Sequence, residues 1–289
     1  VAAALLAAGC GDDDESGGTD ATTTTGAADG PTTTEAVELT ASDVGVTATD
    51  IKVGFVLTDL SQVKPLLGDM GSDKELQQAA YQAFVDEINA AGGINGRTIT
   101  PVFTSTDPVA NDGATACNKL TEDDKVFAVI ANGMFGAPVL CVTQQHETPL
   151  INVGGFINEY YDKSAGRLFT IQPTKPRSAR NTVAALEQEG ALQGKTVGVL
   201  TSQAGDDNVA VKTALVPALE QLDHPVARVA DLAVDSGAAL SQIPVEVTQM
   251  REAGVDLVFL STNAFFSSVF VQTAEEQGYR PQYALSDAD

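Results

Sequence analysis

From Ile51 onward, short apolar segments of strand length alternate regularly with longer segments of helical periodicity. The predicted strands cover residues 51–58, 98–104, 126–131, 150–153, 167–171, 196–201, 226–232, 256–261 and 282–285. The predicted helices cover residues 73–91, 110–122, 137–146, 178–189, 207–222, 240–253 and 265–277. Strands that alternate with helices form parallel sheets covered by helices on both faces. The sequence therefore predicts an α/β fold.

The alternation of predicted strands and helices occurs in two successive series. The segment 53–58 (VGFVLT) is echoed by 197–201 (VGVLT), and a crossover is expected near residues 171–176. We therefore predict two similar Rossmann-like lobes with parallel sheets, lobe 1 at 51–173 and lobe 2 at 174–289.

The first long helix has a clear apolar periodicity. Its predicted sheet-facing side chains are Leu76, Ala80, Ala83, Phe84, Ile88 and Ala91. Gly92 and Gly93 then end the helix, because glycine accepts the left-handed conformation of a helix cap. The following Asn95-Gly96 predicts a turn into the next strand.

The N-terminal residues are typical of an exported protein. Residues 1–10 are an apolar run closed by Gly9-Cys10, which indicates the end of a signal peptide. Small residues before a single cysteine resemble a bacterial lipobox, which predicts lipidation of Cys10. Leu6 lies four positions before this cysteine, whereas a lipobox prefers three. The alternative is an ordinary signal peptide with a chance cysteine.

Residues 11–50 are rich in Gly, Thr, Asp and Ala and predict a disordered acidic tether. Residues 1–51 carry ten acidic residues and no Lys or Arg, out of a net charge of −23 for the 289-residue chain. Since the sequence contains no basic run, binding to nucleic acid or to anionic lipid through basic residues is not expected.

The sequence has no recognisable catalytic or cofactor motif. It lacks a G-x-S-x-G elbow, an H-E-x-x-H helix and a C-x-x-C pair. Its two histidines, His146 and His224, are isolated, and neither a metal nor a cofactor is expected. We predict a protein that is not an enzyme, with a hydrolase of unfamiliar site as the remaining alternative.

The helix-stop-turn-strand segment 84–97 (FVDEINAAGGINGR) resembles the signature of the type I periplasmic-binding-protein family. More narrowly, it is similar to the branched-chain amino-acid (Leu/Ile/Val) type of ABC-transporter substrate-binding protein. Segments 51–57, 123–130, 148–151, 195–200 and 286–287 fit the same framework. The family continues beyond this length, so lobe 2 is expected to be incomplete and the fold C-terminally truncated.

The resemblance implies a small-molecule ligand held between the lobes, at the carboxyl ends of the strands. The candidate ligand-binding residues are Thr58, Asp59, Ser61, Asn132, Gly133, Met134, Phe135, Gly154, Gly155 and Phe156 in lobe 1, and Ser202, Gln203, Asn263, Phe265 and Asp287 in lobe 2.

The amino-acid-binding relatives use Ser or Thr hydroxyls after the third and fourth strands and an acidic residue in lobe 2. The loops at 133–136 and 154–156 carry no hydroxyl, and 261–266 carries no acid. We therefore expect a neutral or weakly polar ligand that is amino-acid-like, an amide or a small aromatic. Four phenylalanines are candidates for an apolar wall, with core packing as the alternative: Phe135, Phe156, Phe265 and Phe266.

The resemblance further implies a monomer anchored by lipid on the extracytoplasmic face, with an ABC permease as partner. The alternative is a ligand-sensing receptor or regulator domain of the same fold. Cys117 and Cys141 fall on consecutive predicted helices and are expected to form a disulfide, the alternative being two buried thiols.

Overall fold

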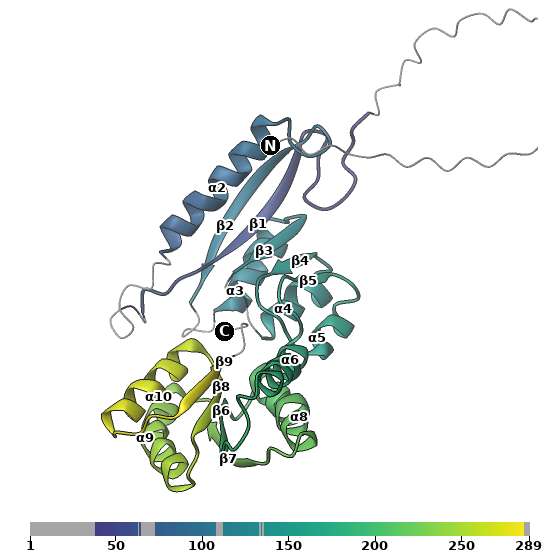
Figure 1. Ribbon diagram of the computed structural model, residues 1–289. Helices are drawn as coiled ribbons and strands as arrows, with labels where there is room; N and C mark the ends of the chain where they lie inside the picture. Colours follow the sequence, from purple (N-terminus) through teal and green to yellow (C-terminus); the bar gives the residue numbers. More distant parts are fainter. Residues whose placement is uncertain are drawn as a thin grey trace, which may run out of the picture. The chain divides into compact units, whose positions relative to one another are not determined.

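A computed structural model describes residues 38–62, 64, 73–107, 112–132, 134 and 136–285, and residues 39–289 belong to one compact unit. Within the described residues the chain forms two parallel sheets, as predicted (Figure 1). All nine predicted strands are present: β1 (Asp50–Thr58), β2 (Thr98–Thr106), β3 (Ala128–Ala131), β4 (Leu150–Asn152), β5 (Leu168–Thr170), β6 (Val197–Ser202), β7 (Val226–Leu232), β8 (Leu257–Ser261) and β9 (Gln282–Leu285).

The helices differ more from the prediction than the strands do. They are α2 (Lys74–Ala90), α3 (Gly113–Asn118), α4 (Pro138–Leu140), α5 (Asn158–Lys163), α6 (Lys175–Gln188), α7 (Asp206–Ala210), α8 (Val216–Gln221), α9 (Ser236–Glu252) and α10 (Ala264–Glu276). Three wider π-helical turns extend α3, α4 and α7: η1 (Lys119–Asp123), η2 (Cys141–Gln145) and η3 (Val211–Leu215). The α5 helix was not predicted.

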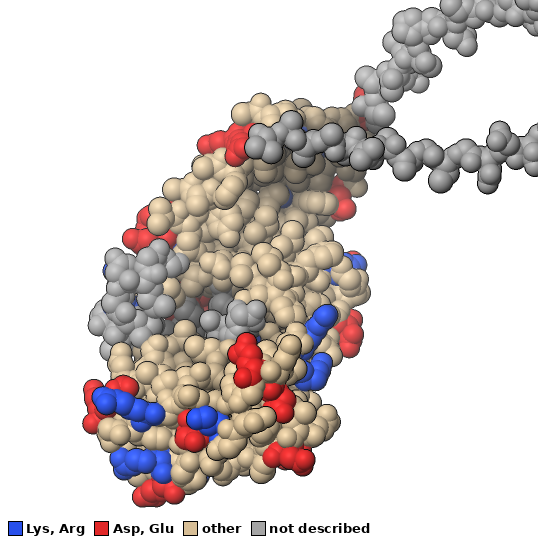
Figure 2. Space-filling view, in the orientation of Figure 1, with Lys and Arg blue, Asp and Glu red and all other residues tan. Residues whose placement is uncertain are grey.

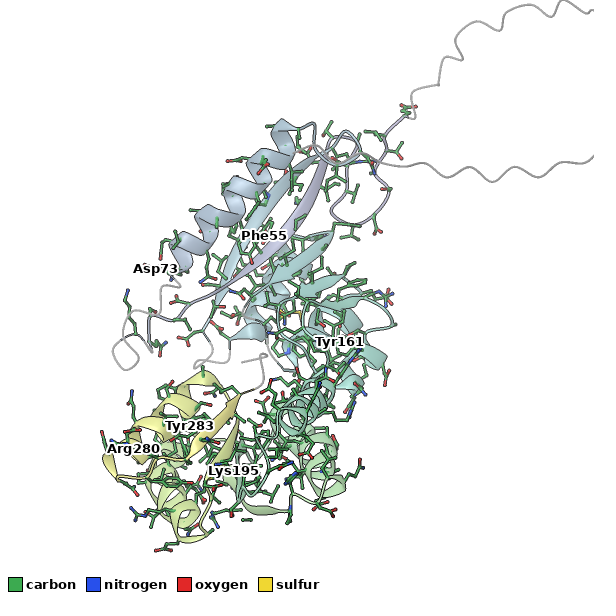
Figure 3. All side chains as sticks on the ribbon, in the orientation of Figure 1. Phe55, Asp73, Tyr161, Lys195, Arg280 and Tyr283 are labelled. Atoms are coloured by element: carbon green, nitrogen blue, oxygen red, sulfur yellow. A yellow bond between two sulfur atoms is a disulfide. The ribbon has the colours of Figure 1, made fainter. Side chains whose placement is uncertain are left out.

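The first sheet has the strand order β2-β1-β3-β4-β5 with parallel neighbours throughout. One face packs against α3, α4 and their π-helical extensions, around buried Val56, Leu120, Val129 and Leu150. The other face contacts α2, which runs alongside β1 and β2 (Figure 1). There Phe55 (Figure 3) lies 5.0 Å from the Tyr81 ring and 5.3 Å from the Phe103 ring.

The predicted packing face of α2 is wrong. Leu76 and Phe84 are 63% and 64% exposed, whereas Val85 is only 2% exposed. The sheet-facing row begins at Gln77 and ends at Asn89 and contains Tyr81 and Val85. An apolar periodicity cannot identify this row, because two of its four members are amides.

Those two amides satisfy the backbone at the strand ends. Gln77 accepts from the backbone N–H of Thr58 at 3.0 Å and donates to its carbonyl at 2.9 Å. Asn89 accepts from the N–H of Ile99 at 2.7 Å and donates to its carbonyl at 2.9 Å. Both strands are therefore attached to α2 by paired hydrogen bonds as well as by apolar contact.

The second sheet has the order β7-β6-β8-β9, again parallel throughout. Its central strands are buried on both faces. Leu200 and Leu232 pack with Ile243 of α9 and Phe270 of α10 on one face. On the opposite face, the second core cluster includes Val199, Phe259, Val183 of α6 and Leu215 of η3. This two-sided burial explains why β6 and β8 read as continuous apolar runs.

The end of the predicted tether is ordered, which corrects the boundary placed at residue 50. Val46 is 8% exposed, and the Arg97 guanidinium donates to the carbonyls of Thr40 and Thr47 at 3.0 and 2.8 Å. A side chain at Gly45 would place its Cβ 2.4 Å from the N atom of Phe127. Residues 40–49 therefore pack against the start of the first sheet, and Cys10 and most of the tether lie outside the described residues.

The charged side chains form mixed groups. On the face shown in Figure 2, Lys and Arg lie among Asp and Glu over the part of the chain that holds α9 and α10. Arg228 of β7, for example, donates to Glu246 of α9 at 2.6 Å. In the part of the chain that the structure describes, no helix is long and apolar enough to cross a membrane.

Candidate functional site

The carboxyl ends of the parallel strands bring most of the predicted ligand-binding residues to the edges of the two sheets. In an open α/β sheet, neighbouring strands whose connections run to opposite faces leave a crevice at this edge. In the first sheet β1 lies between β2 and β3, so the loops after β1 and β3 start from adjacent strands. The predicted residues Thr58 and Asn132 lie there, at the end of β1 and immediately after β3.

The loop after β1 carries an internally neutralised charge. The carboxylate of Asp59 lies 2.5 Å from the Lys74 ammonium and accepts from the backbone N–H of Ser61 at 3.0 Å. These contacts, the Lys74 hydrogen bond first, lower the pKa of Asp59 to about 2. Asp59 is therefore ionised at neutral pH and already holds a cation from the chain itself.

The loop after β3 is hydrogen-bonded to the neighbouring strand β4. Asn152 of β4 donates its amide to the carbonyl of Met134 at 2.8 Å. Met134 is fully buried in the core of the first sheet, so its side chain packs in the core and does not reach the edge. Asn132 is half-buried, and the predicted Gly133 and Phe135 lie outside the described residues.

The loop after β4 packs tightly against the crossover. A side chain at Gly155 would place its Cβ 1.9 Å from the carbonyl oxygen of Pro173, so only glycine fits. Gly154 is half-buried and less constrained. Phe156 is 2% exposed, and its ring lies 5.6 Å from the Tyr160 ring, which places it in the core rather than on an open wall.

In the second sheet, several predicted residues serve the local structure. Ser202 shares a hydrogen bond of 3.0 Å with Thr262, and Gln203 donates its backbone N–H to Leu232 at 2.7 Å. Asn263 caps α10 by accepting from the N–H of Phe266 at 3.0 Å.

The two phenylalanines that follow this cap differ in exposure. Phe266 is buried, whereas Phe265 is half-buried and packs against the same core. The predicted Asp287 lies outside the described residues.

A polar cluster that the sequence analysis missed joins the first turns of α6 and α7 to the start of α5. Lys175 forms an ion pair with Asp207, and its backbone N–H donates to the carbonyl of Phe156 at 3.1 Å. Asp206 accepts a hydrogen bond from the backbone N–H of Ile157. Burial outweighs this bond and the attraction of Lys175, and raises the pKa of Asp206 to about 6.

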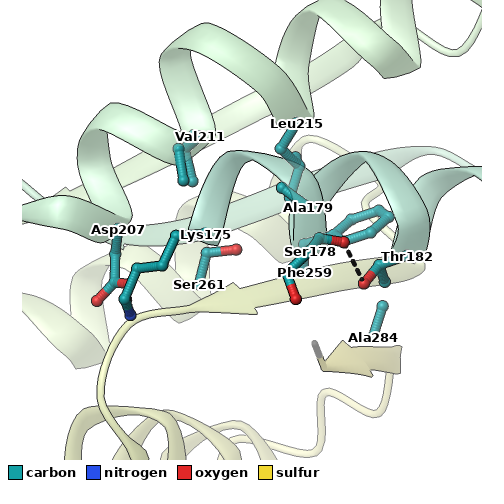
Figure 4. A pocket seen from close by; sticks show the side chains of 11 residues that line it. Lys175, Ser178, Ala179, Thr182, Asp207, Val211, Leu215, Phe259, Ser261 and Ala284 are labelled. Atoms are coloured by element: carbon teal, nitrogen blue, oxygen red, sulfur yellow. Dashed lines mark hydrogen bonds and ion pairs between the residues drawn. The ribbon is translucent and has the colours of Figure 1, made fainter. Parts of the chain in front are cut away.

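A small cavity lies beside this cluster (Figure 4). Its volume is about 30 Å³, which is room for one or two water molecules. Lys175 and Asp207 flank it in Figure 4, and Ser178 and Thr182 of α6 line it together with Ser261, the last residue of β8. Thr182 donates to the carbonyl of Ser178 at 3.1 Å. The cavity therefore offers hydroxyl groups and an ion pair at the carboxyl end of the second sheet.

Cys117 and Cys141 form a disulfide with an S–S distance of 2.02 Å, the pairing favoured from the sequence. It joins the end of α3 to the start of η2, on the face of the first sheet that packs against α3 and α4. These residues hold structure and take no part in the strand-end site.

Comparisons with known proteins agree with the fold. A family model described as "Periplasmic binding protein" matches residues 50–288. The Leu/Ile/Val-binding protein homolog 8 of Brucella suis biovar 1 (strain 1330) is 25% identical over 264 residues, which is 84% of this chain and 61% of that protein. Its name, like the family description, denotes a binding protein and not an enzyme.

Two solved structures share the architecture. A solute-binding protein of an ABC transporter from R. palustris, in complex with 4-hydroxybenzoate, matches with a TM-score of 0.62 and 18% identity over 79% of this chain and 58% of that chain. A substrate-binding protein from Desulfitobacterium hafniense in complex with Leu matches with a TM-score of 0.59 and 16% identity over 82% and 66%. The chain thus spans about 61% of the curated relative's length.

Proposed function

Because this chain belongs to the periplasmic binding protein family, we propose that it is an extracytoplasmic solute-binding protein that delivers a small molecule to an ABC importer. The observation that carries the proposal is the match over residues 50–288, which covers both parallel sheets and all the strand ends at which such folds hold ligands. The ligand is captured between lobe 1 (51–173) and lobe 2 (174–289).

The proposed ligand is an amino-acid-like compound, an amide or a small aromatic. Uncharged groups at the described strand ends support this class: the Ser202 hydroxyl, the Gln203 amide and the half-buried Phe265 ring. Four of the charged groups near the strand ends are paired within the chain, Asp59 with Lys74 and Lys175 with Asp207. The Leu and 4-hydroxybenzoate complexes of the structural neighbours fit a ligand of this size.

A thermal-shift screen of this chain tests the ligand class. The panel contains leucine, isoleucine, valine, 4-hydroxybenzoate and benzamide. A ligand at a hundred times its Kd stabilises the folded chain by about 2.7 kcal/mol, which is readily visible. A shift with benzamide supports the proposal, whereas shifts confined to the compounds that carry a carboxylate, the branched-chain amino acids and 4-hydroxybenzoate, would contradict the argument from the uncharged strand ends.

A substitution in a strand-end loop, with a matched control, locates the site. Gln203→Ala should weaken binding of the compound found in the screen, because Gln203 follows the carboxyl end of β6. Gln221→Ala, at the exposed end of α8, is the matched control and should bind like the parent. Equal binding by both variants would remove Gln203 from the site.

We also propose that the protein is anchored through acylated Cys10 and faces the extracytoplasmic side. The apolar run before Gly9-Cys10 and the acidic, Thr-rich segment after it support this location. The test is detergent phase partitioning of the expressed chain and its Cys10→Ser variant. The parent should enter the detergent phase and the variant the aqueous phase; identical partitioning would overturn the anchor.

A further inference from the structure

Three side chains that bind soft metal ions meet beneath the first sheet, away from the strand-end site. The sulfur atoms of Cys117 and Cys141 and a ring nitrogen of His146 all lie within 4.8 Å of one another. His146 is the residue directly after η2, and its backbone N–H donates to the carbonyl of Cys141 at 3.1 Å. Cys141 and His146 are therefore held at the two ends of one helical turn, and Cys117 reaches them from α3.

A carboxylate lies beside the histidine of this group. The Glu122 Oε1 atom lies 3.4 Å from the Nε2 atom of His146. Cys117 is fully buried, whereas the side chains of His146 and Glu122 are 25% and 57% exposed. The cluster thus has a buried sulfur side and a solvent-accessible side through which an ion can enter.

The donor set matches tetrahedral zinc chemistry. Zn²⁺ is bound in proteins by Cys thiolates, His nitrogens and Asp or Glu oxygens, commonly four in number. With metal–ligand distances of about 2.3 Å for sulfur and about 2.0 Å for nitrogen, the ligand atoms of such a site lie roughly 3.5–3.8 Å apart. The three ligand atoms here lie within 4.8 Å of one another, so metal binding requires a small approach of the imidazole and a separation of the bonded sulfur atoms from 2.02 Å.

We propose that, when its disulfide is reduced, this chain binds a thiophilic divalent cation such as Zn²⁺ through Cys117, Cys141 and His146, with Glu122 as the neighbouring carboxylate. The disulfide and the metal are then alternative states of one site. The metal ligand is the thiolate, so the oxidised form does not bind.

The switch requires a dithiol reductant. One thiolate of the reductant attacks a cysteine sulfur, the Cys117–Cys141 bond breaks, and the second reductant thiol displaces the remaining cysteine. Two electrons pass to the protein, the reductant becomes a cyclic disulfide, and two cysteine thiols result. Binding of the cation then displaces the two thiol protons.

The backbone geometry allows both states. The Cα atoms of Cys117 and Cys141 are 6.3 Å apart, and each carries its sulfur on a single rotatable bond from the backbone. Rotation about these bonds can therefore separate the sulfur atoms toward metal-binding distance. The core around them, including Leu120 and Val142, keeps the two helices in place.

The test uses the full chain with Cys10→Ser, so that only two thiols remain. The chain is reduced with dithiothreitol, freed of reductant without oxygen and titrated with Co²⁺. We expect one equivalent of cobalt to produce thiolate-to-cobalt charge-transfer absorption and the visible bands of tetrahedral cobalt. The oxidised chain should give neither. A reduced, folded chain without these bands would overturn the proposal.

Two histidine variants provide a matched pair. His146→Gln should weaken cobalt binding by more than about tenfold and alter the visible bands, since second-shell losses alone reach this size. His224→Gln is the control, because the Nε2 atom of His224 likewise lies beside a carboxylate, 2.9 Å from Glu187, and His224 follows α8, which packs in the core of the second sheet. Equal spectra from both variants would exclude His146 as a ligand.

A second measurement covers the case in which reduction unfolds the chain. Metal binding to a site that exists only in the folded state restores folding, so Zn²⁺ should recover the circular dichroism spectrum of the reduced chain. It should not do so for the Cys117→Ser, Cys141→Ser double variant. Failure of Zn²⁺ to restore folding of the reduced parent would overturn the proposal equally.

Discussion

Replacing Asp206 with Asn should make the chain more stable at neutral pH and leave its stability at pH 4 almost unchanged. In the folded chain, burial raises the pKa of Asp206 from 3.8 to about 6, despite the attraction of Lys175 and the hydrogen bond from Ile157. A carboxyl whose folded pKa is raised stabilises the fold fully below the unfolded pKa. That contribution is lost as the pH rises through the folded pKa. The sensitive window is therefore about pH 4 to 6.

The magnitude follows from the shift. About two pKa units correspond to roughly 3 kcal/mol at about 1.4 kcal/mol per unit. The carboxyl is only half-buried, so solvent screening reduces the expected difference to about 1–2 kcal/mol. For a chain of this size each kcal/mol moves Tm by about 2–4 °C. Asp206→Asn should therefore raise Tm by about 2–8 °C at pH 7.5 relative to the parent.

The assay is Tm by circular dichroism from pH 4 to 7.5 for parent and variant in the same buffers. Taking the difference between the two cancels the effect of every other acidic group. Asp207→Asn is the matched control: it removes the ion pair with Lys175, so it should destabilise the chain at pH 7.5 instead. A difference between Asp206→Asn and the parent that does not change with pH would refute the reasoning.

Two further variants test packing and the cross-link. Phe156→Ala should cost about 3–5 kcal/mol of unfolding free energy in urea titrations, because the ring is buried in the core. A loss below about 1 kcal/mol would instead indicate that Phe156 lines the ligand site and is not part of the core. The Cys117→Ser, Cys141→Ser double variant should lower stability by about 3 kcal/mol, as expected for a sequence separation of 24, and an unchanged Tm would contradict a closed disulfide.

The strands were predictable because buried strands consist of uninterrupted apolar residues, which are visible in the sequence. Strands β6 and β8 are covered on both faces and therefore appear as unbroken apolar runs. The helix α5 was missed for the opposite reason. It is six residues long and contains no buried residue, so its sequence (NEYYDK) carries no apolar period. The π-helical turns η1 and η2 were also missed, since a wider turn leaves no distinct residue pattern.

The orientation of α2 shows a limit of apolar periodicity. The strongest apolar row, which includes Leu76, Phe84 and Ile88, is exposed in the structure. The row that faces the sheet contains Gln77 and Asn89, whose amides pair with the backbone at the ends of β1 and β2. A hydrogen bond to a particular backbone group depends on where the strands end in space, and this cannot be read from the residue types alone.

The position of the strand-end loops was predictable, whereas the side chains that these loops expose were predictable only in part. Parallel topology fixes that the loops after β1, β3, β6 and β8 lie at the carboxyl edges, so this much follows from the strand–helix rhythm. Which side chains point outward depends on packing. Met134 and Phe156 turn into the core, although their loop positions alone suggested a ligand-facing role.

The lysines that pair with acids at these edges come from helix N-termini, whereas the candidate residues of the sequence analysis came from the loops that follow strands. Lys74 begins α2 and neutralises Asp59, and Lys175 begins α6 and neutralises Asp207. In each pair, the lysine of one helical first turn meets an acid that follows a strand or begins another helix. The chain thus uses its own charges to hold these loops in place. Under the proposed function, a ligand that reaches these pairs meets salt bridges already made, so we expect its recognition to rest on hydroxyl, amide and ring contacts. This is the physical reason for expecting an uncharged or weakly polar ligand.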